Sequence, residues 1–159
     1  MRKIIGFIFW LFISLHSEHI FAKHIIGGDM FYKCLRVDTA RKVVNFAVTL
    51  KMYRDCYAEG GAELDPSIVI GFYEKLPNGS FRYLKKLSDV RLKSIILLYP
   101  EPDNPCLIIP EDVCVQEGTY EFQTGNLPFS ANSYYIVYQR CCRNESISNI
   151  INPGEDGAA

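Results

Sequence analysis

Alternating side chains between residues 42 and 57 place the strongest constraint on how this chain folds. In the stretch KVVNFAVTLKMYRDCY, large apolar residues occupy every second position: Val44, Phe46, Val48, Leu50 and Met52. The positions between them are mostly smaller or more polar. Successive side chains of a β-strand point to opposite faces, so this pattern predicts a strand with one face buried in a core. Its β-branched and aromatic residues favour the same conformation.

Strand-like patterns recur along the chain. Further strands are predicted over residues 23–36, 67–76, 81–87, 90–99, 118–124 and 133–142. The stretch 90–99 also permits a short helix, but its apolar end, IILLY, favours a strand. Asn78-Gly79 lies between two of these strands and is the strongest short signal for a β-hairpin. We therefore expect an all-β fold, an immunoglobulin-like β-sandwich of about seven or eight strands.

The first 22 residues have the layout of a secretory signal peptide. Arg2 and Lys3 precede a continuous apolar run, IIGFIFWLFISL, and Ala22 provides a small residue for cleavage. The run is shorter than the roughly 20 residues that a membrane-spanning helix needs. No second long apolar run follows, so the mature chain, residues 23–159, is expected to form one domain with no membrane span. This predicts an exported protein, secreted or held at the cell surface.

The charge of the chain argues against one class of partner. The sequence contains 17 Lys and Arg residues against 18 Asp and Glu residues, a formal net charge of −1. Domains that bind nucleic acid present a strongly basic face. A nearly balanced chain gives no electrostatic basis for such a face, so we expect no nucleic-acid partner.

Six cysteines follow the predicted cleavage site: Cys34, Cys56, Cys106, Cys114, Cys141 and Cys142. An even number of cysteines in an exported chain predicts a disulfide-stapled fold. Structural zinc sites use Cys or His ligands at short spacings such as C-x-x-C, which does not occur in this sequence. A catalytic thiol needs a histidine base, and His24 is the only histidine after residue 22. We therefore expect no metal site, no catalytic residue and no cofactor.

The pairing of these cysteines is a hypothesis, because six cysteines allow many combinations. Cys141 and Cys142 continue a predicted strand, so their side chains would point to opposite faces and reach different partners. Cys106 and Cys114 enclose the short loop LIIPEDV, and we expect them to pair with each other. The two cysteines nearer the N-terminus would then pair with the adjacent cysteines.

Charged residues lie beside several of the cysteines. Arg54 and Asp55 immediately precede one of them, and Arg140 and Arg143 flank the adjacent pair. An acid–base pair is conceivable, but arginine is a poor proton donor. We expect structural ion pairs that lock strand ends near disulfides, which is the usual use of contacts between arginine and carboxylates.

Five sequence blocks, in this order, resemble one family. They are HIIGGDMFYKCL, MYRDCY, NPCLIIPEDVCVQEGTYEF, YYIVYQRCCRNESISNIINP and PGEDG. Together they resemble the N-terminal domain of large exported Bacteroidota proteins of the gliding-motility-associated or PKD-repeat adhesin type. The resemblance covers residues 24–157. It implies that the chain is the N-terminal part of a longer surface or secreted protein, and that the six cysteines are disulfide positions.

The family that the chain resembles has no catalytic motif to carry over. We expect a protein that is not an enzyme, an extracellular or cell-surface β-domain for adhesion or structural display, with a protein or glycan as its surface ligand. The alternative is a carbohydrate-binding module of a secreted glycan-acting protein. Tyrosines distinguish the two: a row of them exposed on one sheet face would favour sugar binding, whereas buried tyrosines would indicate core packing.

Overall fold

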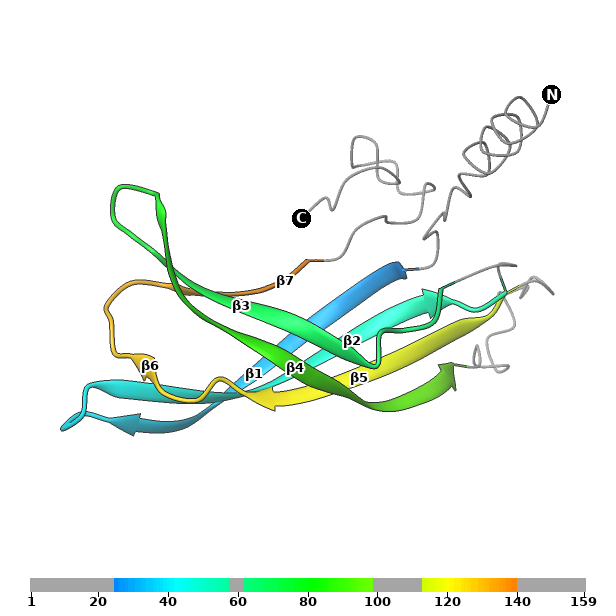
Figure 1. Cartoon of the computed structure of the whole chain (residues 1–159), viewed down its shortest axis with the longest axis horizontal. Helices are drawn as coiled ribbons and strands as arrows, with labels where there is room; N and C mark the ends of the chain where they lie inside the picture. Colours follow the sequence, from blue (N-terminus) through cyan, green and yellow to red (C-terminus); the bar gives the residue numbers. More distant parts are fainter. Residues whose placement is uncertain (1–24, 58–61, 99–112, 140–159) are drawn as a thin grey trace, which may run out of the picture.

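The computed structural model describes residues 25–57, 62–98 and 113–139 of the chain (Figure 1). These residues form seven strands: β1 (Ile25–Asp38), β2 (Val43–Asp55), β3 (Ser67–Lys75), β4 (Phe81–Leu98), β5 (Val115–Gln123), β6 (Leu127–Pro128) and β7 (Tyr134–Tyr138). No helix occurs in these ranges. The predicted all-β class is confirmed.

The strands form one antiparallel sheet that curls back on itself. The strand order is β1-β2-β5-β4-β3-β7, and β6 pairs with the start of β2. Figure 1 shows β3 and β4 crossing over β1 and β2. We name β1, β2, β5 and Leu92–Leu98 of β4 the β2 layer, and β3, β7 and Phe81–Arg91 of β4 the β3 layer. This arrangement is compatible with the predicted sandwich.

β4 belongs to both layers and connects them. Its first part, Phe81–Arg91, pairs with β3, and its second part, Leu92–Leu98, pairs with β5. The sequence pattern predicts two strands with a break near residue 88, whereas the structure has one strand of 18 residues. Register shifts flank the junction, one opposite Ile68–Ile70 and one between Leu92 and Ser94. Such irregularities bend and twist a strand, which lets β4 pass from one layer into the other.

The core lies between the two layers. The inward side chains of β2 that are at most 5% exposed are those that the alternating pattern predicts: Val44, Val48, Leu50 and Met52. Ring contacts join the layers, with Phe46 of β2 against Tyr134 of β7 and Phe72 of β3 against Phe122 of β5. The ring centroids are 6.3 and 6.4 Å apart, respectively. Neither ring pair joins two strands that are hydrogen-bonded to each other. These contacts therefore hold the two layers of the curled sheet together.

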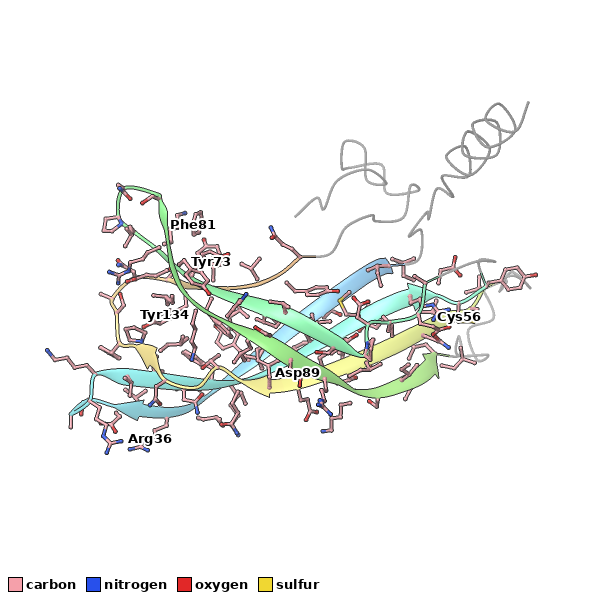
Figure 2. All side chains as sticks on the ribbon, in the orientation of Figure 1. Arg36, Cys56, Tyr73, Phe81, Asp89 and Tyr134 are labelled. Carbon is pink, nitrogen blue, oxygen red and sulfur yellow. A yellow bond between two sulfur atoms is a disulfide. The ribbon has the colours of Figure 1, made fainter. Side chains whose placement is uncertain are left out.

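A disulfide joins the ends of the neighbouring strands β2 and β5, near the label of Cys56 in Figure 2. Cys56 and Cys114 have Cα atoms 5.1 Å apart and lie one position beyond the ladder pair Asp55 and Val115. The backbone N–H of Cys56 also donates to the carbonyl oxygen of Cys114 over 2.9 Å. The predicted pairings of Cys114 with Cys106 and of Cys56 with one of the adjacent cysteines are therefore wrong. The antiparallel register of two strands distant in sequence, not the spacing within a loop, selects the partner.

Removing this disulfide is expected to destabilise the fold strongly. The bond joins residues 58 positions apart, and constraining a loop of that length in the unfolded chain contributes about 4 kcal/mol. We expect the double variant Cys56→Ala/Cys114→Ala to lose about this amount from the free energy of unfolding, measured by urea denaturation. Cys34→Ala, which removes a free and exposed thiol, is the matched control. Equal stability of the double variant and the control would contradict this account.

Candidate functional site

The outward face of the β3 layer carries a row of tyrosines. Tyr73 of β3 lies between Tyr83 of β4 and Tyr135 of β7, directly opposite both in the strand registers. Tyr83 is 54% exposed and Tyr135 is 39% exposed. The neighbours of Tyr73 along β3, Phe72 and Glu74, point inward and are almost fully buried. The row is therefore a surface feature and not a part of the core.

Ring contacts extend this row into a larger surface. The rings of Tyr73 and Tyr83 have centroids 5.6 Å apart at an interplanar angle of 65°, and those of Phe81 and Tyr135 are 4.9 Å apart at 83°. Such edge-to-face pairs contribute about 0.5–1.5 kcal/mol each beyond the burial of their area. They also hold the rings in fixed relative orientations. We name Tyr73, Phe81, Tyr83 and Tyr135 the aromatic face.

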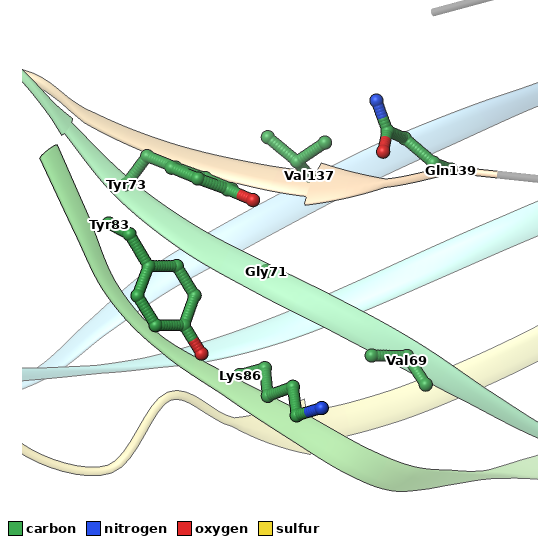
Figure 3. A pocket seen from close by; sticks show the side chains of 7 residues that line it. All are labelled: Val69, Gly71, Tyr73, Tyr83, Lys86, Val137 and Gln139. Atoms are coloured by element: carbon green, nitrogen blue, oxygen red, sulfur yellow. The ribbon is translucent and has the colours of Figure 1, made fainter. Parts of the chain in front are cut away.

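A shallow hollow of about 230 Å³ adjoins the aromatic face (Figure 3). Its lining residues come from β3, β4 and the end of β7: Val69, Gly71, Tyr73, Tyr83, Lys86, Val137 and Gln139. Gly71 makes room for the ring of Tyr73, because a Cβ atom at this position would lie 2.9 Å from a ring carbon. Lys86 and Gln139 bring hydrogen-bonding groups to an otherwise largely apolar lining.

The outward face of the β2 layer is chemically different. Four charged side chains of its β2, β4 and β5 strands form ion pairs: Lys51 Nζ lies 3.0 Å from Glu117 Oε1, and Lys93 pairs with Glu121. The hydrogen bond to Glu117 raises the pKa of Lys51 above its ordinary value. These four charges neutralise each other and leave little capacity for a ligand on this part of the face. The aromatic face of the β3 layer is therefore the better candidate for a binding surface.

Glu74 supports the aromatic face from the buried side of β3. Its carboxylate is almost fully buried, accepts hydrogen bonds from the Ser130 hydroxyl and from Asn132 Nδ2, the latter over 2.8 Å, and pairs with Arg82 of β4. The bonds from Ser130 and Asn132, with the contribution of Arg82, outweigh the effect of burial and lower the pKa of Glu74. The carboxylate thus ties β3 to β4 and to the segment that leads into β7.

One tyrosine is buried in the core, in contrast to the exposed tyrosines of the aromatic face. Tyr120 of β5 is 1% exposed, and its hydroxyl donates to the backbone oxygen of Asp65 over 2.7 Å. A buried polar group needs such a partner. The tyrosines of the chain therefore serve both purposes that the sequence suggests, core packing at Tyr120 and surface display on the aromatic face.

The structure separates two residues that the sequence groups as an ion-pair constellation. Arg54 is 6% exposed and pairs with Glu63. Asp55 follows it in β2, so its side chain points to the opposite face. The carboxylate of Asp55 accepts the backbone N–H of Tyr57 over 2.9 Å. The ion pair of Arg54 lies beside the disulfide at the strand end, with a partner that the sequence analysis does not identify.

Several predicted positions lie outside the described residues: Cys106, Cys141, Cys142, Arg140 and Arg143. Cys34 lies on β1 as a free and exposed cysteine. Among the residues that the structure describes, no group of three or more His, Cys, Asp or Glu side chains could hold a metal ion. No helix in the same part of the chain is long and apolar enough to span a membrane.

The fold and the site define an all-β, disulfide-stapled domain with an aromatic outward face on one layer and a charged outward face on the other. Comparisons with protein-family models, with curated proteins and with solved structures find no match to this chain. The aromatic face itself is not identified by the sequence analysis. The available signal was the presence of Tyr73, Phe81 and Tyr83 around the predicted Asn78-Gly79 hairpin.

Acid is expected to remove the support that Glu74 provides. Because folding lowers the pKa of Glu74, its contribution to stability is present above the ordinary glutamate pKa of about 4.3 and is lost as pH falls through the lowered folded-state pKa. We expect Glu74→Gln to lower stability at neutral pH and to flatten the acid limb of the stability curve, measured by urea unfolding. Glu121→Gln, at an exposed carboxylate of the β2 layer, is the control. Parallel acid limbs for wild type and Glu74→Gln would refute this assignment.

Proposed function

We propose that this chain is a non-catalytic extracellular domain that acts in adhesion or structural display at the cell surface. The observation that carries the proposal is the aromatic face, which exposes Phe81, Tyr83 and Tyr135 side by side on one layer. Contiguous apolar surface exposed on a soluble protein is characteristic of an interaction site. Tyrosine suits such a site, because its ring provides contact area and its hydroxyl a hydrogen bond.

Export and a non-enzymatic role fit the same picture. The Cys56–Cys114 disulfide is of the kind that persists in oxidising, extracytoplasmic compartments. The aromatic face has no nucleophile paired with a base among its four residues, and Lys86 and Gln139 beside it are binding groups. This agrees with the resemblance of the chain to N-terminal domains of exported Bacteroidota adhesins, which is itself part of the proposal.

A second candidate is a carbohydrate-binding module, and the hollow beside the aromatic face favours it. Sugar rings have apolar C–H faces bordered by hydroxyl groups, so they match an aromatic wall with polar groups at its edge. Tyr73 and Tyr83 border the hollow in Figure 3 with their ring planes 65° apart, and Lys86 and Gln139 provide the polar edge. An aromatic row exposed on one sheet face is the arrangement that separates sugar binding from core packing of tyrosines.

Adhesion can be measured with beads that carry the purified chain. We expect these beads to be retained under flow on mucin-coated or chitin-coated surfaces, and Tyr83→Ala/Tyr135→Ala beads to be released. Tyr57→Ala is the matched control, because Tyr57 is 57% exposed beside the disulfide and outside the aromatic face. Equal retention of all three proteins would remove the aromatic face from the proposed function.

A glycan array distinguishes the two candidates. If the chain is a carbohydrate-binding module, wild type binds a defined set of glycans, and Tyr83→Ala weakens the Kd at least about fivefold, the effect of losing a central aromatic contact. Gly71→Val should act in the same direction, because its side chain would displace the ring of Tyr73. Bead retention on mucin, with no retention on chitin and no binding on the array, would instead indicate a protein ligand and support the first candidate alone.

A further inference from the structure

β1 is an edge strand with exposed apolar side chains. Among the described strands it pairs with β2 alone. Five of its large apolar residues are between 41% and 72% exposed: Ile26, Phe31, Tyr32, Leu35 and Val37. Natural edge strands are usually short or protected by charges or proline, because an open edge pairs with other chains. β1 is 14 residues long and contains no proline, and its charged residues include both signs, so its edge can accept a further strand whose charges match.

The regular part of β1 has an internal symmetry. Register shifts near both ends leave an uninterrupted stretch, Gly27–Cys34, and Phe31 lies near its centre. Asp29 and Lys33 lie two positions to either side of Phe31, so all three side chains share one face of the sheet. The charges at these two positions have opposite signs. A strand with this pattern is complementary to a second, antiparallel copy of itself.

We propose that two copies of this chain associate by pairing their β1 strands antiparallel about a two-fold axis at Phe31. In that register, Phe31 lies opposite Phe31 of the second copy, and Asp29 lies opposite Lys33 on both sides of the axis. Directly opposite residues have Cβ atoms about 4.5–5.5 Å apart, so the charges form two cross-strand ion pairs. The β2 layers of the two copies become one continuous sheet, and the closed symmetry limits assembly to a dimer.

Charge selects this register over its neighbours. Residues that lie opposite each other in a sheet point to the same face. In a symmetric pair of β1 strands this holds only if the two-fold axis passes through a residue, and not between two residues. An axis at Asp29 or at Lys33 brings like charges directly together. An axis at Met30 or at Tyr32 places both charges opposite uncharged residues. Within this stretch, Phe31 is the position at which opposite charges meet.

The other open edge of the β2 layer does not show such a pattern. Leu92–Leu98 of β4 exposes four consecutive apolar residues, between 36% and 49%: Ile95, Ile96, Leu97 and Leu98. Its charged side chain, Lys93, pairs within the chain with Glu121. Nothing in this segment selects a register for a second copy, so β1 is the edge that the structure fits for self-association. The dimer does not depend on the ligand of the aromatic face, which lies on the other layer.

Charge reversal tests the register, with sedimentation equilibrium of the full chain over a wide concentration range. Asp29→Lys and Lys33→Asp each replace two attractive pairs by two repulsive ones, and each is expected to weaken the dimer Kd at least about tenfold. The double variant D29K/K33D restores attraction and should return the Kd to within about threefold of wild type. Lys75→Asp, at an exposed position of β3, is the matched control and should leave the Kd unchanged.

Each outcome of this experiment either supports or overturns the proposed dimer. Recovery of the dimer in the double variant supports the register and shows that the single variants are not simply unfolded. A wild-type chain that stays monomeric throughout overturns the proposal, and so does a double variant that is as weak as the single ones. Growth beyond the dimer that Asp29→Lys does not weaken also overturns it, because that result indicates that association does not depend on the proposed β1 register.

Discussion

The sharing of β4 between two layers is the constraint on which the rest of the structure depends. Its hydrogen bonds run to β3 along Phe81–Arg91 and to β5 along Leu92–Leu98, so the sheet has to fold over where one partner is exchanged for the other. Folding over buries the inward side chains of β2 against those of β3 and leaves one outward face on each layer. The core, the aromatic face and the open edges of the β2 layer all follow from the path of this strand.

Local patterns in the sequence are sufficient to predict where the strands lie. They are insufficient to predict which residues of two distant strands lie opposite each other. The alternation over residues 42–57 identifies the inward face of β2, because burial of one face requires a period of two whatever strand lies opposite. The disulfide partner of Cys56 depends on the register between β2 and β5, whose residues are far apart in the sequence. The number of residues between two cysteines in a loop gives no information about that register. The short separation of Cys106 and Cys114 in the sequence therefore predicts the wrong disulfide.

The aromatic face depends on the length of a single loop. A two-residue Asn-Gly turn, the form that its sequence favours, would pair Tyr73 with Leu84. The observed loop is closed by hydrogen bonds within Leu76–Ser80, has Gly79 at a φ of 83°, and pairs Tyr73 with Tyr83. A shift of one residue sends a side chain to the other face of a sheet. The extra loop residue thus determines whether Tyr83 lies in the core or on the surface, and this cannot be deduced from strand periodicity.

The position of the disulfide also determines how the domain transmits a pulling force. Tension applied to the chain before Cys56 and after Cys114 passes directly through the bond between their sulfur atoms. The residues between them, which include β3 and β4, carry none of that load and cannot be drawn out while the bond is intact. Three of the four rings of the aromatic face belong to this stretch. A chain that is pulled from both of its ends would therefore keep most of the aromatic face on a segment of backbone that carries no load.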